Sequence, residues 1–293
     1  MKITLLGTGT SCGVPQIGCS CPVCSSTDVH DKRFRCSALI EAEGKRILID
    51  CGPDFRQQML TIPFEPLDAV FITHEHYDHV GGLDDLRPYS IFGEVDVYAE
   101  QFCIDHLLER IPYCFTPKEK RYPGVPAINL LPIEPHVPVL ISQKEEIPVN
   151  EKFMDDMLRE KRRYILDKRT QQMKQVPGAG QPLEVIPIRV MHGKLPIVGF
   201  RIGKLAYITD MSTLPDEEFN YLQGVELLIV NGLRHEPHPS HQTFEQAIAF
   251  SEKIGAKETY LIHMSHHIKP HAQEDALLPA HVHLAFDGLV LEV

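Results

Sequence analysis

Short apolar runs, separated by turn-forming residues, recur along the chain and predict strands. The opening of the chain holds three of them, at 2–6, 37–42 and 45–50, with Gly44 in the turn between the last two. Further runs that read as buried strands lie at 67–73, 183–191, 204–209, 226–230 and 259–262, and a closing pair is expected around Asp287 and Gly288. Several of the middle runs end at a polar side chain, so these strands are expected to deliver polar groups to one edge of a sheet.

Helical patterns lie between the strands. The clearest covers 243–254, where Thr243 and Gln246 form a capping-box pattern and Gly255 supplies the stop. Because strands and helices alternate through much of the chain, we expect a layered α/β fold. At 293 residues and 43% hydrophobic content, residues 1–293 are expected to form a single domain.

The region 111–182 breaks this pattern and is interpreted as an insertion. It is rich in proline at first and then in charged residues from 151 to 174. We expect it to be largely helical, with the charged stretch as a solvated helix face. A lid, a dimer contact or a substrate-facing arm are the alternatives.

Charge and composition narrow the class of protein. The chain has 29 Lys and Arg against 40 Asp and Glu, a net charge of -11, which argues against a general nucleic-acid binder because such proteins need a basic face. The first ten residues lack a secretory apolar region, and no later stretch reaches membrane-spanning length. We therefore expect a cytoplasmic protein with no membrane contact and with reduced cysteines.

Four potential metal ligands stand within six residues, directly after a predicted buried strand: His74, His76, Asp78 and His79. Imidazole suits zinc, iron and similar ions, and a carboxylate widens the range to manganese. From an extended turn, His74 and His76 can face one ion, while Asp78 and His79 begin the next turn and can face a second. The spacing therefore predicts a site for two divalent ions.

The H-x-H-x-D-H run resembles the hallmark of the metallo-β-lactamase superfamily. The resemblance implies an αββα sandwich and three further ligands at strand ends. His192 would complete the first site, Asp210 would bridge the two ions, and His263 would complete the second. It also implies that Asp50 orients the ligand-bearing loops. Taken singly, these residues have ordinary readings as a turn histidine, a helix cap, a core histidine and a strand-end turn.

The charge of such a site suits an anion. Two divalent ions (Mn, Zn or Fe) bring about +4, and Asp78, Asp210 and one bridging hydroxide remove about three, which leaves about +1. Paired ions lower the pKa of bound water toward about 7 and clamp the attacking and leaving oxygens. Asp78 therefore counts among the catalytic residues as well as among the ligands.

A second cluster of metal-binding type lies near the start of the chain. Cys19, Cys21 and Cys24 place three thiolates within six positions, a spacing that lets them share one tetrahedral zinc with a ligand from elsewhere. We expect His266 to be that fourth ligand. Such a closed coordination sphere leaves no position for water, so this zinc is expected to be structural.

The thiolate cluster and the stretch 50–56 (Asp-Cys-Gly-Pro-Asp-Phe-Arg) resemble the subgroup that contains the phosphoribosyl cyclic phosphodiesterase of phosphonate breakdown. The coenzyme PQQ-biosynthesis protein B is similar too. The phosphodiesterase resemblance implies that His241 protonates the leaving oxygen, with His235 and His238 as alternatives. An unperturbed histidine pKa of about 6.5 suits such a donor.

These observations favour a metal-dependent hydrolase of a small cyclic or simple phosphodiester. One alternative is a tRNase Z-like RNA-processing nuclease, against which the acidity of the chain stands. The other is a non-hydrolytic accessory protein like PQQ-biosynthesis protein B. Hydrolysis of β-lactams is disfavoured because those enzymes are exported. The substrate, the native metal and a homodimeric state stay open.

Overall fold

The computed structural model describes residues 1–116, 120, 124–142, 164–167, 172–175 and 181–293. The chain folds into two compact units. Unit 1 holds Met1 and residues 39–133 and 140–183, and unit 2 holds residues 2–38, 134–139 and 184–293. Strands β2 (Ser37–Ala42), β7 (Val139–Ile141) and β10 (Leu183–His192) run across the sequence boundaries between the units.

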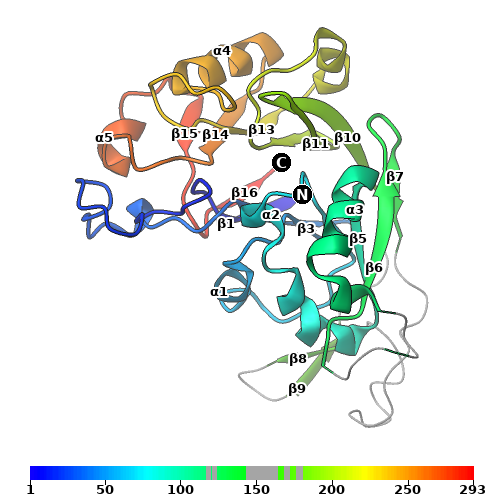
Figure 1. Cartoon of the computed structure of the whole chain (residues 1–293). Helices are drawn as coiled ribbons and strands as arrows, with labels where there is room; N and C mark the ends of the chain where they lie inside the picture. The colour runs from blue at the N-terminus through cyan, green and yellow to red at the C-terminus, as the bar shows by residue number, and fades with distance from the viewer. Residues whose placement is uncertain (117–119, 121–123, 143–163, 168–171, 176–180) are drawn as a thin grey trace. The chain divides into compact units, whose positions relative to one another are not determined.

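Unit 1 is built around four parallel strands. Their order is β3-β4-β5-β6, and their bounds are Lys45–Ile49, Ala69–Phe71, Val95–Glu100 and Ile128–Ile133. All of β3 and β4 is buried, as expected of strands covered on both faces. Helix α3 (Gln101–Arg110) packs on β5 and β6 (Figure 1).

Unit 1 also holds described elements outside these parallel strands and α3. They are α1 (Phe55–Met59), α2 (Tyr77–Val80), the 3₁₀ segments η2 (Leu83–Phe92) and η3 (Pro112–Phe115), and the antiparallel pair β8 (Tyr164–Asp167) and β9 (Gln172–Gln175).

Unit 2 is built around a mixed sheet in the order β15-β14-β13-β12-β11-β10. Its strands β12 to β15 are parallel, while β10 and β11 form antiparallel pairs. Their bounds are Val282–Leu284, Glu258–Ile262, Leu227–Asn231, Leu205–Ile208, Leu195–Ile202 and Leu183–His192. Unit 2 also contains the antiparallel pairing of β1 (Lys2–Gly7) with β16 (Val290–Glu292).

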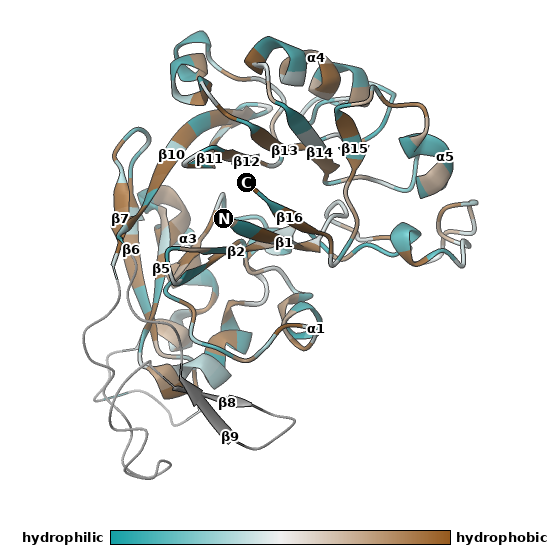
Figure 2. Cartoon of the chain, turned by 180° about the vertical axis from the view of Figure 1, so that it is seen from behind, coloured by the Kyte–Doolittle hydropathy of each residue, from teal (hydrophilic) through white to brown (hydrophobic). Residues whose placement is uncertain are grey.

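Helices cover the mixed sheet of unit 2. Helix α4 (Phe244–Ile254) packs on β13 and β14, and α5 (His271–Asp275) packs on β15. Both hydrophobic and hydrophilic residues occur along α4 (Figure 2), and its buried side includes Phe244, Ala247 and Phe250. Unit 2 also holds the 3₁₀ segments η1 (Val29–Asp31) and η6 (Asp216–Leu222).

The helix predicted at 243–254 is confirmed with its caps. Thr243 is the N-cap of α4 and forms both hydrogen bonds of a capping box with Gln246. Gly255 ends the helix in the left-handed region at φ 74°. The strand patterns at 2–6, 37–42 and 259–262 are also strands in the structure.

The expectation of a largely helical insertion at 111–182 is wrong for the part of it that the structure describes. Apart from η3, the described elements there are the strands β6, β7, β8 and β9. Strand β6 pairs in parallel with β5 and buries Ile128 and Ile133. Strand β6 was not predicted because the prolines in and before its short apolar run suggested an irregular segment. The charged stretch 151–174 lies outside the described residues, except for β8 and the first part of β9.

None of the helices in the described ranges is long and apolar enough to cross a membrane.

Candidate metal centres

Three of the expected site residues follow strands in a strained backbone conformation. Asp50, Asp210 and His263 have φ values of 59°, 56° and 57°. Asp50 comes directly after β3, His263 comes directly after β14, and Asp210 lies two residues after the end of β12. Residues other than glycine adopt positive φ at a cost, and such strain persists where surrounding structure enforces it, often at functional sites. The backbone conformation at these three positions therefore sets the direction in which each side chain points.

In unit 1, the segment after β4 carries the four candidate ligands of the histidine-rich run. His74 Nε2 lies 3.0 Å from His76 Nδ1, and His79 Nε2 lies 3.2 Å from Asp78 Oδ2. His74, Asp78 and His79 are buried. Two donor atoms at such a distance can both reach one ion at the usual bond length of about 2.0–2.2 Å.

Asp50 fixes the orientation of the segment that carries Thr73 and His79. Its carboxylate accepts hydrogen bonds from the Thr73 N–H (2.8 Å) and the Thr73 hydroxyl (2.9 Å), and its Oδ2 lies 2.6 Å from His79 Nδ1. A proton on Nδ1 directed at Asp50 leaves Nε2 of His79 available to bind a metal ion. Burial raises the pKa of Asp50, and the neighbouring His79 partly offsets this.

Close packing of backbone explains part of the 50–56 motif. The Cys51 N–H donates to the His79 carbonyl, and the Gly82 N–H donates to the Cys51 carbonyl, each at 2.8 Å. A Cβ atom on Gly82 would lie 2.1 Å from the Gly52 carbonyl oxygen. Only a residue without a side chain fits there, so the segment after Asp50 and the helix with His79 are locked together.

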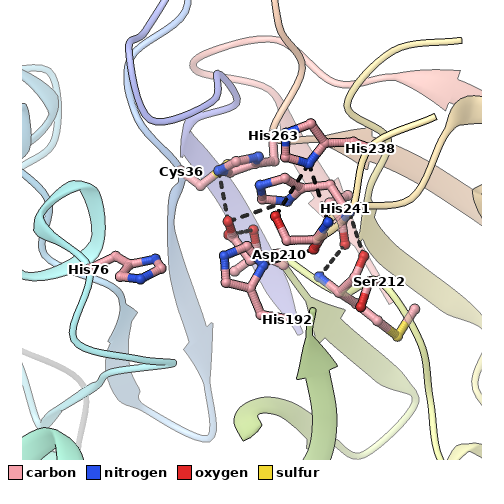
Figure 3. Close-up of polar contacts among 12 residues, drawn as sticks. Cys36, His76, His192, Asp210, Ser212, His238, His241 and His263 are labelled. Carbon is pink, nitrogen blue, oxygen red and sulfur yellow. Dashed lines mark hydrogen bonds and ion pairs between the residues drawn. The ribbon is translucent and has the colours of Figure 1, made fainter. Parts of the chain in front are cut away.

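In unit 2, three strand ends bring His192, Asp210 and His263 toward one another, as Figure 3 shows. His263 Nε2 lies 3.0 Å from Asp210 Oδ1. His192 Nδ1 lies 2.8 Å from the Ser240 carbonyl oxygen, to which it can donate, so that Nε2 remains for an ion. His241 also joins this group, since ligand atoms of His192, Asp210 and His241 lie within 4.8 Å of one another.

Two residues that were not predicted from the sequence fix the loop after Asp210. Asn231, at the end of β13, accepts from the Met211 N–H (2.8 Å) and donates to the Met211 carbonyl (2.9 Å). The Ser212 hydroxyl donates to the Met191 carbonyl at the end of β10 (2.7 Å). A fully buried asparagine that ends an apolar run is the signal that could have pointed to this role.

His241 does not keep an ordinary pKa. Burial and the nearby His263 lower the pKa of His241 to about 3, although Asp210 acts in the opposite direction. Its Nδ1 lies 3.6 Å from Asp210 Oδ1, which is beyond hydrogen-bond distance. The ordinary pKa expected for His241 is therefore not kept, because burial favours the neutral imidazole.

The other two candidate donors have different surroundings. The His235 ring lies between two carboxylates, with Nδ1 2.7 Å from Glu245 and Nε2 2.9 Å from Glu274. His238 Nδ1 lies 3.2 Å from the Ser240 hydroxyl, and burial and Arg234 lower the pKa of His238. Among the three, His241 is the one grouped with two of the expected ligands of unit 2.

The thiolate cluster is complete within unit 2. Ligand atoms of Cys19, Cys21, Cys24 and His266 all lie within 4.8 Å of one another. His266 Nδ1 is 3.3 Å from the Cys19 sulfur and 3.4 Å from the Cys21 sulfur. The Cys24 N–H points at the Cys21 sulfur at 3.4 Å. This geometry suits one tetrahedral ion.

The thiols of Cys21 and Cys24 differ in acidity. Burial raises the pKa of Cys21, but hydrogen bonds from the Cys24 N–H and His266 outweigh it and lower the pKa to about 6. Burial raises the pKa of Cys24 to about 11. A bound cation would favour the thiolate form of both.

All expected ligands therefore fall into three groups. Unit 1 brings together His74, His76, Asp78 and His79, and unit 2 holds both the group of His192, Asp210 and His263 and the thiolate cluster with His266.

The chain matches known proteins over most of its length. The family model described as "Beta-lactamase superfamily domain" matches residues 45–264. An octanoyltransferase of Porphyromonas gingivalis is 44% identical over 291 residues, which cover 99% of this chain and 51% of that protein. Coenzyme PQQ synthesis protein B of Methylobacterium radiotolerans is 29% identical over 168 residues, 49% of this chain and 56% of that protein. The chain thus spans about half the length of these curated relatives.

Solved structures resemble the chain over its whole length. A diphosphatase from the PhnP family has a TM-score of 0.79 at 34% identity, covering 99% of this chain and 96% of that one. Zinc-bound PqqB from Methylobacterium extorquens has a TM-score of 0.69 and the short form of human tRNase Z one of 0.61, both at 20% identity and with 99% or more of each chain covered. The last two show the fold alone. Together the matches confirm the expected α/β sandwich class.

Replacing Asp50 with asparagine should weaken metal binding by unit 1. The variant would present an amide group where His79 Nδ1 needs a carboxylate acceptor, and loss of such an outer partner typically lowers metal affinity by about 10- to 100-fold. Competition titration with a chromophoric chelator measures this. Asp105→Asn is the matched control, because Asp105 lies exposed on α3 and accepts from Gln101. Equal affinities for Asp50→Asn and wild type would contradict the role of Asp50.

Replacing Cys21 with serine should lower the melting temperature by roughly 5 °C or more. A lost ligand costs the closed site a few kcal/mol, and about 1 kcal/mol shifts Tm by about 2–4 °C in a domain of this size. Cys12→Ser is the control, since Cys12 is exposed in the same N-terminal region. Scanning calorimetry with metal analysis would reveal the difference, and identical melting of both variants would argue against a structural metal.

Proposed function

This chain belongs to the beta-lactamase superfamily, and on that premise we propose that it is a metal-dependent phosphodiesterase that hydrolyses a small cyclic or simple phosphodiester. The proposal gives the active site two divalent ions (Mn, Zn or Fe) and the thiolate cluster one structural zinc. The match of the family model over residues 45–264 supports the metal-dependent hydrolase class.

The observation that carries the proposal is the pairing of donor atoms within each unit. His74 with His76, Asp78 with His79, and Asp210 with His263 stand at 3.0–3.2 Å, which suits shared ions. As the family resemblance implies, His74, His76 and His192 would hold one ion, and Asp78, His79 and His263 would hold the other. Asp210 would serve as a ligand for both. When bound, such ions supply Lewis acidity and an activated water.

The residues of the chain itself orient these groups and handle the proton. Asp50 sets the ring of His79, and the Ser240 carbonyl sets the ring of His192. His241 is proposed to protonate the leaving oxygen. Because its pKa of about 3 leaves it neutral in the free protein, a nearby negative charge has to favour the protonated ring. An anionic phosphodiester beside His241 supplies that charge.

A second candidate reaction is cleavage of a diphosphate. The similarity to a PhnP-family diphosphatase at 34% identity favours it. A departing phosphate is a far weaker base than an alkoxide, so diphosphate cleavage would depend less on His241. Transfer of an octanoyl group is not carried over, because about half of that relative's length lies outside the aligned part.

A substrate panel separates the candidates. Bis(p-nitrophenyl) phosphate, a ribose cyclic phosphate, a dialkyl diphosphate and a precursor tRNA would be tested with Mn²⁺, Zn²⁺ and Fe²⁺. We expect turnover of the small phosphodiesters. Cleavage of precursor tRNA without turnover of cyclic ribose phosphate would favour the nuclease reading. If every substrate stays intact while ions remain bound, the result would support an accessory role like that of PQQ synthesis protein B.

Replacing His241 with alanine should lower the rate of hydrolysis of alkyl phosphodiesters by about 10²- to 10⁴-fold. Hydrolysis of p-nitrophenyl esters should slow much less, because p-nitrophenolate leaves without a proton. The ratio of wild-type to variant rates on the alkyl substrate should fall as pH rises, since only protonated His241 donates. Steady-state kinetics between about pH 5 and 9 measures both effects. Equal losses on the two leaving groups would assign His241 to metal binding instead.

A further inference from the structure

The loop between β13 and α4 carries His241, the proposed proton donor. Two backbone hydrogen bonds close the base of this loop. The Leu233 N–H donates to the Gln242 carbonyl (3.0 Å), and the Phe244 N–H donates to the Arg234 carbonyl (3.1 Å). Residues 235–241 lie between these two hydrogen bonds. Because loops are mobile, side-chain contacts help to hold this segment in one conformation.

His235, at the start of the closed loop, provides such contacts through both nitrogens of its ring. Nδ1 lies 2.7 Å from Glu245 on α4, and Nε2 lies 2.9 Å from Glu274 on α5. Both contacts at once require the imidazolium, since a neutral ring has one N–H. Burial lowers the pKa of His235, but the hydrogen bonds to Glu245 and Glu274 outweigh it and raise the pKa.

The two carboxylates differ strongly in burial. The side chain of Glu245 is 63% exposed and that of Glu274 is 1% exposed. The second oxygen of Glu274 accepts from the Lys269 N–H at 2.8 Å. A buried carboxylate needs such partners to offset the loss of water. Glu274 therefore joins the loop of His235 to the segment around Lys269, which follows His266 of the thiolate cluster.

We infer that Glu274, acting through His235, is a positioning residue that holds the loop of His241 in place for proton donation. The inference rests on the proposed function of His241. It also gives His235 a role other than that of the proton donor, because both of its ring nitrogens are engaged by carboxylates. The exposed Glu245 contributes less, since a solvated pair is weak.

Glu274→Gln and Glu245→Gln form a matched pair of variants. Each replaces one carboxylate that contacts His235 by an amide of the same shape. We expect Glu274→Gln to lower kcat on an alkyl phosphodiester by about 10- to 100-fold, with KM, metal content and p-nitrophenyl ester turnover within about twofold of wild type. Glu245→Gln should stay within about twofold on every substrate. In the His241→Ala background, Glu274→Gln should have no further effect.

The imidazole resonance of His241 gives a readout that does not depend on activity. It is identified among the 16 histidines by its loss in His241→Ala, and we expect Glu274→Gln to shift it and Glu245→Gln to leave it in place. A shifted resonance without any phosphodiester turnover in the wild type would overturn the proposed function but support the positioning role. Normal turnover with an unmoved resonance and unchanged kcat in Glu274→Gln would overturn the inference. His235→Gln provides the same comparison if Glu274→Gln fails to fold.

Discussion

The proposed active-site groups of both units depend on one constraint, which is that imidazole and carboxylate groups stay buried side by side with their donor atoms close together. In unit 1 the His79 and Asp78 donor atoms are 3.2 Å apart, and in unit 2 those of His263 and Asp210 are 3.0 Å apart. Burying such groups costs free energy that a bound cation offsets. The positive φ at Asp50, Asp210 and His263 adds to this cost. A bound cation accounts for this close packing of buried imidazole and carboxylate groups.

Features encoded within a few residues of sequence could be predicted. The run from His74 to His79, the three cysteines and the caps of α4 each depend on local spacing. The structure confirms the caps and brings donor atoms of the other two sets close together. The family resemblance supplied the distant candidate ligands His192, Asp210 and His263, which no spacing rule connects.

Features that depend on tertiary contacts could not be predicted. The lowered pKa of His241 arises from burial and from His263, which is distant in sequence. The hydrogen bonds of Asn231 and the contact between His235 and Glu274 likewise join residues that no local pattern relates. Strand β6 was missed because its prolines suggested an irregular segment. For His241, Asn231 and His235, the deciding interaction is made by residues far apart in the chain.

Binding of ions at two chemically different centres is the central claim, and metal analysis tests it most directly. Mass spectrometry of the purified protein should find about three ions per chain, two of which a chelator removes together with phosphodiester turnover, while a thiolate-bound zinc stays until the protein unfolds. Full turnover by a protein with less than about one ion per chain would contradict this claim.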